Sequence, residues 1–226
     1  MNYLTDIVLD GCKMNRCTNF FLNKGYSLET IEKYKLGYYP KGVSAYAHII
    51  DEDKKVLKCY KYIIPEINQE NEIQYLILRS DREEVLKQLN FNIDKHFYVG
   101  ASDRNIWNKK ALFKDNPVFI CETWTDALSV IDCGFEAVSL NRIINIVELW
   151  KIVRNFKKQR KFLLFGDNDY YGKQANDNLI RMLSAEKHLW TVVDNFPSNI
   201  KDANEWFLFD KNDFKNTLRR KYNELL

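Results

Sequence analysis

Two aspartates separated by a single residue are the clearest chemical feature of the sequence. Asp167 and Asp169 follow the apolar run KFLLF (161–165), which is typical of a buried strand. If strand geometry continues this far, both carboxylates point to one side and Asn168 points away. Carboxylates this close repel one another unless a cation lies between them. A turn in which the aspartates bond their own backbone is the alternative interpretation.

Further acidic residues follow other apolar runs that are expected to form strands. Glu122 comes directly after the run PVFIC, and Asp202 comes soon after the run LWTVV. Asp126 lies three residues after Thr123, which is the spacing of a helix capping box, so capping is the alternative role for this residue. Acidic residues at helix starts are also common, which applies to Asp202. Glu122 has no comparable local role.

Carboxylates gathered at one edge of a sheet suit a hard divalent cation. Mg²⁺ and Mn²⁺ bind few carboxylates and leave positions for water and phosphate oxygens. Such an ion can activate a hydroxyl nucleophile and neutralise charge on a phosphate during in-line displacement. Glu122, Asp167, Asp169 and Asp202 therefore predict a magnesium or manganese site that carries out phosphoryl or nucleotidyl transfer.

The elements that must position these residues alternate from residue 116 onward. Strands are expected at 117–121, 136–140, 161–165 and 189–193, and helices at 123–133, 146–156, 173–183, 202–208 and 213–225. This alternation predicts an α/β fold with a parallel sheet covered by helices. In such sheets the functional residues gather at the carboxyl ends of the strands. We expect this domain to span residues 115–226.

The preceding residues, 1–114, are expected to form a smaller α+β subdomain. The first forty residues are predicted to be helical, with Ser27 as a helix cap. Three runs rich in β-branched and aromatic residues follow, and the polar turns between them indicate an antiparallel meander. These runs are 43–50, 56–64 and 73–80, whereas residues 83–113 give no clear pattern.

Composition describes an ordinary globular protein. The chain has 226 residues, of which 46% are hydrophobic and 29% charged, and its net charge is only +3. No global field therefore favours a polyanionic partner, and any contact with nucleic acid must come from local patches. Five cysteines, no signal peptide and no long apolar run predict a cytoplasmic protein without membrane contact. Cys12 and Cys17 have no second pair at zinc-site spacing, so a structural zinc is not expected.

The glycines near the aspartate pair do not form a P-loop. The segment GDNDYYGKQ has five residues between its glycines instead of four, and Gln174 stands where a Ser or Thr would meet the metal. Aspartates inside a phosphate cradle would also repel the ligand.

Three motifs in order resemble the Toprim domain, the acidic fold shared by bacterial-type primases, topoisomerases and some nucleases. ETWTDALSV with GFEAVSL resembles its first acidic segment, and FGDNDYYGKQA resembles its Asp-x-Asp-x-x-Gly-x-x-Ala segment. KDANEWF looks like the Lys-Asp-x-Asn-Glu stretch of phage replicative primases. FFLNKGYSLETIEKYKLGYYP is similar to the opening of the bacterial primase catalytic core, which favours primases over other Toprim proteins. The resemblance spans residues 18–210 and implies a Toprim-type parallel sheet flanked by helices.

The resemblance also implies roles for individual residues. Glu122 would be a metal ligand or general base, and Asp167 and Asp169 would be metal ligands of the catalytic centre. Asp126 and Asp202 would support the same Mg²⁺ or Mn²⁺ site as further acidic residues. Basic residues of the meander would bind template or nucleotide phosphates, or alternatively form a solvated strand face; they are Lys58, Lys61 and Arg79.

The function implied is a primase-like core that joins nucleoside triphosphates into short RNA primers on single-stranded DNA. A Toprim nuclease is one alternative, because the same carboxylates can direct water at a phosphodiester. A non-catalytic module that binds DNA or a helicase is another, since Thr123 and Asn141 stand where relatives have glycine. The sequence shows neither a zinc ribbon nor helicase motifs, so a replicative helicase or a separate zinc-binding protein is an expected partner.

Overall fold

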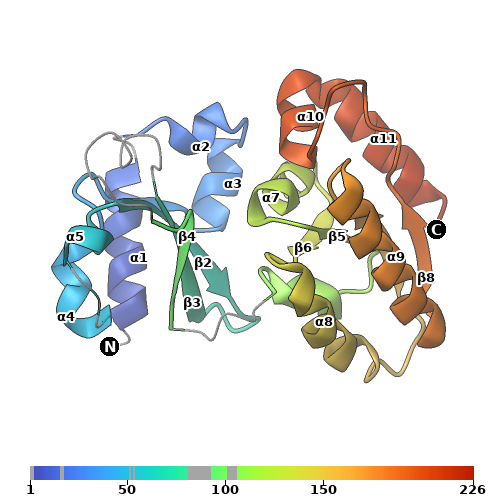
Figure 1. Ribbon diagram of the computed structural model, residues 1–226, viewed down its shortest axis with the longest axis horizontal. Helices are drawn as coiled ribbons and strands as arrows, with labels where there is room; N and C mark the ends of the chain where they lie inside the picture. The colour runs from blue at the N-terminus through green and yellow to red at the C-terminus, as the bar shows by residue number, and fades with distance from the viewer. Residues whose placement is uncertain (1–2, 16–17, 51, 53, 81–92, 101–105) are drawn as a thin grey trace. The chain divides into compact units, whose positions relative to one another are not determined.

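The computed structural model describes residues 3–15, 18–50, 52, 54–80, 93–100 and 106–226. The chain divides into two compact units, the first formed by residues 1–23 and 27–103 and the second by residues 24–26 and 104–226. Each unit has its own sheet, and each is described by itself below (Figure 1). Within the described residues, no helix is long and apolar enough to cross a membrane.

The first unit is built on an antiparallel sheet with one face covered by a helix. Its described strands run in the order β1 (Gly37–Tyr38), β2 (Tyr60–Ile67), β3 (Ile73–Ser80) and β4 (His96–Val99). Helix α1 (Tyr3–Met14) packs its apolar side on β2 and β3, where Ile7 and Val8 join Ile63 and Leu76 in one buried cluster. The shorter elements are α2 (Phe20–Asn23), α3 (Leu28–Lys33), η2 (Ser44–Tyr46), α4 (Ala47–Ile50) and α5 (Lys54–Leu57).

The meander expected from the sequence is only partly correct. Residues 60–67 and 73–80 do pair as antiparallel strands, but residues 44–50 form η2 and α4 instead of a strand. The reason lies in spacing: the buried residues of this run, Val43 and Ala47, are four apart, which places them on one side of a helix. Two further strands complete the described sheet: β1, which pairs with β2 inside the segment expected to be helical, and β4, which pairs with β3 and comes from the region without a clear pattern. Residues 83–92 and 101–105 of that region lie outside the described residues.

The second unit is a doubly covered parallel sheet, as the sequence predicts. Its described strands run in the order β6, β5, β7, β8, and every pairing is parallel. The strands are β5 (Val118–Cys121), β6 (Glu136–Ser139), β7 (Lys161–Phe165) and β8 (Leu189–Val192). The helices are α7 (Trp124–Asp132), α8 (Ile146–Val153), α9 (Tyr170–Ala185), α10 (Ala203–Phe209) and α11 (Lys211–Asn223), with short 3₁₀ turns η3 (Lys109–Phe113) and η4 (Ile143–Asn145).

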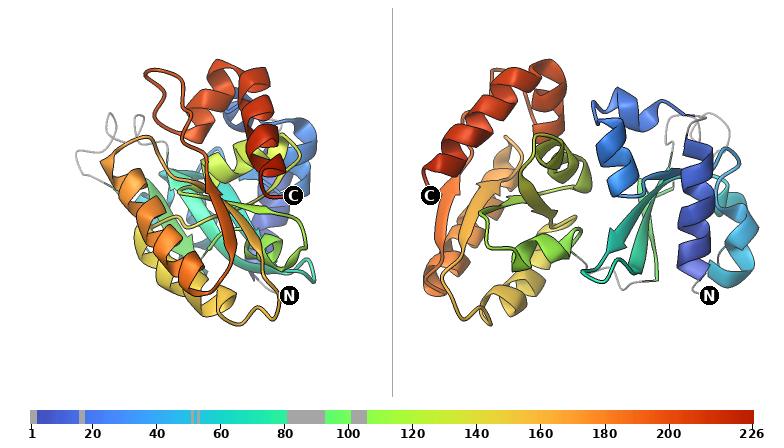
Figure 2. Two further views of the ribbon diagram at one scale, coloured as in Figure 1. Left: turned by 90° about the vertical axis from the view of Figure 1, so that its right-hand side faces the viewer. Right: turned by 180° about the vertical axis from the view of Figure 1, so that it is seen from behind.

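Alternate residues of each central strand face opposite layers of helices. On one face, Ile120 and Leu164 join a buried cluster with residues of α8 and α9. On the other face, the ring of Phe165 packs against Trp206 of α10 and Phe214 of α11. Figure 2 shows these helices on the two sides of the sheet. Burial on both faces explains why these strands are continuous apolar runs rather than alternating ones.

The division by contacts differs from the sequence-based division at 114/115. The backbone of Trp107 forms an antiparallel bridge with Ser139, and the amide of Asn108 donates to the carbonyl of Ala137 at 2.7 Å. The segment 106–114 therefore packs with the parallel sheet. Residues 24–26 do so as well, since the hydroxyl of Tyr26 donates to the carbonyl of Thr125 at 3.0 Å.

Candidate active site at the edge of the parallel sheet

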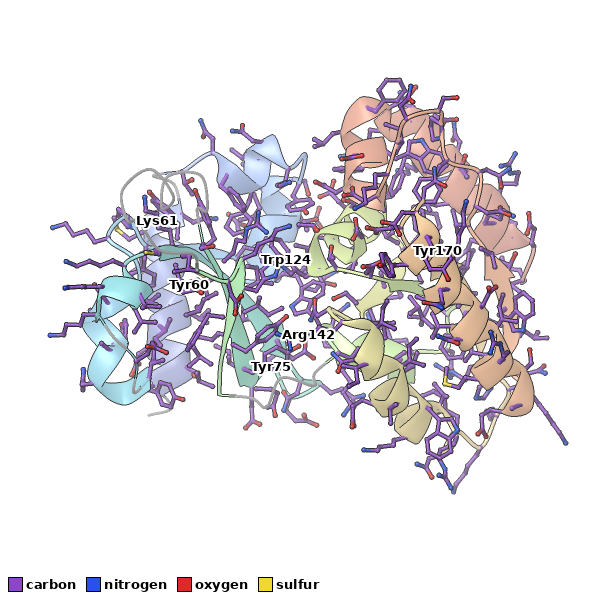
Figure 3. The ribbon with its side chains drawn as sticks, viewed as in Figure 1. Tyr60, Lys61, Tyr75, Trp124, Arg142 and Tyr170 are labelled. Atoms are coloured by element: carbon purple, nitrogen blue, oxygen red, sulfur yellow. The ribbon has the colours of Figure 1, made fainter. Side chains whose placement is uncertain are left out.

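The strand order of the second unit changes direction at β5. From β5 the chain passes through α7 to β6, whereas β7 lies on the other side of β5 and continues into α9. Helices α7 and α9 cover opposite faces of the sheet, so the segments that leave β5 and β7 diverge at the carboxyl ends of these neighbouring strands. Figure 3 labels Trp124, Arg142 and Tyr170 on the segments that follow β5, β6 and β7.

Glu122 is the first residue after β5, and one of its carboxylate oxygens has no protein partner. In the described part of the chain, its Oε2 is buried and makes no hydrogen bond. Burial raises the pKa of Glu122, and the negative charge of Asp169 raises it further. The backbone here is fixed, because the amide of Asn141 donates to the carbonyl of Glu122 at 2.8 Å. A buried oxygen without a partner is costly unless a bound group satisfies it.

Asp167 is the second residue after β7, and no hydrogen bond within the described residues ends on its carboxylate. Its pKa is raised to about 8, first by burial and then by the charges of Asp126, Glu122 and Asp202. The register of the sheet explains this proximity, since Cys121 pairs with Phe165 at the ends of the two strands. Among the described residues, the carboxylate of Asp167 thus accepts no hydrogen bond, whereas Glu122 accepts one from the backbone of Asp167 and keeps its Oε2 without a partner.

Two glycines position the segment that carries Asp167. A Cβ atom on Gly172 would lie 2.5 Å from the amide nitrogen of Asp167 and 2.7 Å from its carbonyl carbon. A Cβ on Gly166 would lie 2.7 Å from the carbonyl oxygen of Gly172. The first turn of α9 thus packs backbone to backbone against the strand end, which only glycine permits at both positions. These glycines serve close packing, in agreement with the rejection of a P-loop.

Asp169 caps α9. Strand β7 ends at Phe165, so strand geometry does not extend to Asp169 as the first interpretation of the pair assumed. One carboxylate oxygen of Asp169 accepts from the amide of Gly172 at 2.9 Å, and the other lies 3.4 Å from the ammonium of Lys201. The bond from Gly172 is the main cause that lowers the pKa of Asp169. The backbone-bonding alternative therefore applies to this aspartate.

Asp202 caps a helix as well, and Asp126 lies in the first turn of α7. The buried Asp126 accepts from the backbone of Thr123 at 3.2 Å, which confirms the capping box, and from the backbone of Asn204 at 3.2 Å. Burial raises its pKa to about 7, and the charge of Asp202 adds to this. Asp202 caps α10 by accepting from the amide of Glu205 at 2.7 Å, while burial is the main cause that raises its pKa.

Two residues of the site were not identified from the sequence. Asn204 is buried, and its amide donates to the hydroxyl of Ser129 at 2.9 Å and to the carbonyl of Lys24 at 3.1 Å. Lys201 brings an ammonium to Asp169, and this partner raises the pKa of Lys201. Both belong to the KDANEWF motif, in which the sequence indicates only acidic residues as part of the site.

The donor set fits a hard divalent cation. Among the described residues, no three His, Cys, Asp or Glu side chains already converge as a metal cluster. Mg²⁺, however, is commonly held by only one or two carboxylates together with water and phosphate oxygens. Glu122, with its unpartnered Oε2, and Asp167 could supply two such oxygen ligands, and Asp126 and Asp202 add negative charge that raises the pKa of Asp167.

The basic residues singled out from the sequence all lie in the first unit. Lys58 is exposed in the turn before β2, and Lys61 is half-buried on β2. Arg79 lies on β3, with its guanidinium 3.3 Å from the Nε2 of His96. Their proposed contact with phosphates stays a prediction.

The chain is similar to known primases both in sequence and in structure. Residues 119–207 match the family model described as Toprim-like. A DNA primase of Mycoplasma genitalium is 29% identical over 126 residues, which cover 52% of this chain and 21% of that protein. This chain therefore spans about a fifth of the length of this curated relative.

Solved structures extend the likeness over nearly the whole chain. The Aquifex aeolicus primase, comprising zinc-binding and RNA polymerase domains, has a TM-score of 0.66 and 17% identity and covers 97% of this chain and 59% of its own. The RNA polymerase domain of the Mycobacterium tuberculosis primase has a TM-score of 0.65 and 12% identity, and the match covers 97% of this chain and 81% of that one. The primase fragment of the bacteriophage T7 primase-helicase has a TM-score of 0.56 and 18% identity, and the match covers 88% of this chain and 71% of that one.

At these identities the structural matches establish the fold alone, which is the fold shared by these primase structures. The family match covers the segment that carries Glu122, Asp126, Asp167, Asp169 and Asp202, which we call the acidic edge. Residues 119–207 are therefore similar to Toprim-like domains, in agreement with the resemblance found in the motifs.

Proposed function

We propose that this chain is a primase catalytic core that joins nucleoside triphosphates into short RNA primers on single-stranded DNA. The observation that carries the proposal is a pair of carboxylates directly after the neighbouring strands β5 and β7: Glu122, whose buried Oε2 has no partner among the described residues, and Asp167, whose pKa is raised to about 8. Such a pair is unfavourable in the isolated protein and becomes favourable with a cation and a phosphate between them.

The proposed cofactor is Mg²⁺ or Mn²⁺, with Glu122 and Asp167 as the residues that would hold it. When bound, such an ion supplies charge neutralisation at the phosphate that reacts. We propose that Asp169 and Asp202 add negative charge to this cation site, and that Asp126 supports the site without binding the ion directly. In this structure both oxygens of Asp126 are used by hydrogen bonds to the backbone of α7 and α10.

Glu122 is also the proposed general base. Its raised pKa makes its carboxylate a stronger base than an exposed glutamate, so its Oε2 can accept the proton of the attacking hydroxyl. Lys201 holds Asp169 and adds one positive charge beside the carboxylates, which favours a polyanionic triphosphate. Lys58, Lys61 and Arg79 are proposed to bind phosphates of template or nucleotide.

The proposed partners follow from the same comparison. The T7 structure is a fragment of a primase-helicase protein, and the Aquifex structure contains a zinc-binding domain. A replicative helicase or a separate zinc-binding protein is therefore the proposed partner of this chain.

The test is oligonucleotide synthesis by the purified chain. Single-stranded DNA, labelled ribonucleoside triphosphates and Mg²⁺ or Mn²⁺ are expected to give short products. Glu122→Gln is expected to abolish them, while Glu148→Gln, at an exposed ion pair on α8, leaves them unchanged. Loss of a labelled strand without added nucleotides would instead identify a nuclease. DNA binding without product on any template, even with dinucleotide primers, would identify a non-catalytic module.

A further inference from the structure

Two neighbouring tyrosines at the start of α9 have no role in the core of the second unit. Tyr170 is 72% exposed and Tyr171 is 64% exposed. The buried residues of α9 begin with Gly172 and continue along a different side of the helix. The two rings nevertheless contact one another, with centroids 5.5 Å apart and planes at 79° (Figure 3 labels Tyr170). Both rings therefore leave apolar surface in contact with water, where a ligand can cover it.

The position of the pair connects it to the acidic edge. Tyr170 directly follows Asp169, the cap of α9, and the same short segment carries Asp167. Lys173 is exposed and lies three residues after Tyr170, so its ammonium is on the same side of the helix. Lys201 adds a second ammonium, 3.4 Å from a carboxylate oxygen of Asp169. The two aromatic rings, the two ammonium groups and the carboxylate of Asp167 therefore lie on one short segment or next to it.

A nucleotide has the chemistry that matches this arrangement. Its base stacks on an aromatic ring regardless of sequence, and its phosphates pair with ammonium groups and with a cation held by carboxylates. The edge-to-face contact restrains both rings and leaves ring faces open, so little side-chain entropy is lost on stacking. A protein partner fits less well, because the apolar surface is limited to two side chains among polar neighbours such as Asn168 and Lys173.

We propose that Tyr170 and Tyr171 form a stacking platform for a nucleobase next to the acidic edge. This inference rests on the proposed function, because it places the base of a nucleotide beside the carboxylates that would act on its phosphates. The base belongs either to a free nucleoside triphosphate or to a bound strand, and both share the chemistry of stacking.

The test compares ligands with and without a base. Binding of ATP and of tripolyphosphate, each with Mg²⁺, is measured for the wild type and for the double variant Tyr170→Ala/Tyr171→Ala. We expect ATP affinity to fall about 5- to 140-fold, which corresponds to about 1–3 kcal/mol per stacked base at about 1.4 kcal/mol per tenfold. Tripolyphosphate affinity is expected to stay unchanged, and Tyr170→Phe/Tyr171→Phe is expected to retain ATP binding.

A second arm uses oligo(dT) and an abasic strand of the same length. If the double variant loses affinity for oligo(dT) but not for the abasic strand or ATP, the stacked base belongs to a bound strand. If it loses affinity for ATP but not for oligo(dT), the stacked base belongs to the nucleotide. Phe209→Ala is the matched control, because Phe209 is 71% exposed at the end of α10. Unchanged affinity of the double variant for both ATP and oligo(dT), or an equal loss for ligands without a base, would overturn the proposal.

Primer synthesis separates this inference from the proposed function. If the wild type makes primers and the double variant keeps the same KM for nucleotides and the same affinities, the platform is refuted and the function stands. If the wild type makes no primers but the double variant loses base-dependent binding, the platform stands and the function is refuted. Because both rings are exposed, the melting temperature of the double variant is expected to equal that of the wild type.

Discussion

Replacing Asp167 by Asn is expected to stabilise the metal-free protein at neutral and mildly alkaline pH. The structure raises the pKa of this carboxyl from 3.8 to about 8, so folding opposes its ionisation. In the unfolded chain the same group ionises freely above pH 3.8. The stability contributed by the protonated form is therefore complete below the unfolded pKa and is lost as pH rises toward 8. Asparagine cannot ionise and avoids this loss.

The magnitude follows from the difference between the two pKa values. Taken at full value, the change from 3.8 to about 8 corresponds to about 6 kcal/mol. Asp167 is only partly buried, and solvent screening reduces the expected gain to about 1–2 kcal/mol at pH 8. At pH 4 the two proteins are expected to have nearly the same free energy of unfolding, because Asp167 is then protonated in the folded state.

Replacing Asp169, in the same segment, is expected to change the free energy of unfolding in the opposite direction. Asp169→Ala removes the cap of α9 and the ion pair with Lys201, so we expect it to destabilise the protein by about 0.5–2 kcal/mol. Because the pKa of Asp169 is lowered, its contribution is present above its unfolded pKa and is lost as pH falls through its folded value.

The free energies of unfolding of the wild type, Asp167→Asn and Asp169→Ala are measured by urea unfolding at pH 4 and pH 8 without divalent cations. An Asp167→Asn variant that is less stable than the wild type at pH 8 would refute the view that this carboxylate has no structural partner. If Asp169→Ala were as stable as the wild type, its assignment as a helix cap would be wrong.

Two further variants test how the site is held. Gly172→Ala is expected to cost about 1–3 kcal/mol and to reduce activity about 100-fold, because its Cβ would displace the backbone of Asp167. Gly134→Ala is its control, since its φ of +92° brings strain but no atom lies within 4 Å of the added Cβ; equal activity of the two variants would refute the packing argument. Asn204→Ala, which removes one buried and one partly buried hydrogen bond, is expected to lower the free energy of unfolding by about 1–3 kcal/mol in urea unfolding, and a loss below about 0.5 kcal/mol would contradict this.

The fold of the second unit could be predicted because each of its central strands is buried on both faces. Double burial gives short continuous apolar runs, and each run is separated from the next by a helix with a clear start. Gly134, with a φ of +92°, ends α7 at the expected place. Asn141 adopts the left-handed conformation, with a φ of +57°, which asparagine tolerates better than most residues.

The first unit was harder to predict because composition and spacing disagreed. The run 43–50 has the β-branched and aromatic residues of a strand, but its buried residues have helical spacing. Strand β4 has only four residues, and it depends on pairing with β3 rather than on its own pattern. Tertiary contacts thus decided both cases, and these are not visible in a local window of sequence.

The sequence predicts that the acidic residues of this edge lie together, but it does not predict which of them cap helices and which are available to a metal ion. A strand end followed by a helix start favours aspartate both as a cap and as a metal ligand, so the residue type does not separate the two. The structure separates them by hydrogen bonding, since Asp126, Asp169 and Asp202 accept backbone amides. In contrast, Glu122 has a buried oxygen without a partner, and Asp167 has a pKa raised to about 8.

Binding of Mn²⁺ in the absence of nucleotide and DNA tests the central claim most directly. The free Mn²⁺ signal in electron paramagnetic resonance is measured during titration of wild type, Glu122→Gln, Asp167→Asn and Asp115→Asn, an exposed acidic control paired with Arg160. We expect the wild type and Asp115→Asn to bind with the same affinity and the two site variants to lose at least tenfold in affinity. Equal binding by all four proteins would contradict the claim that Glu122 and Asp167 hold the cation.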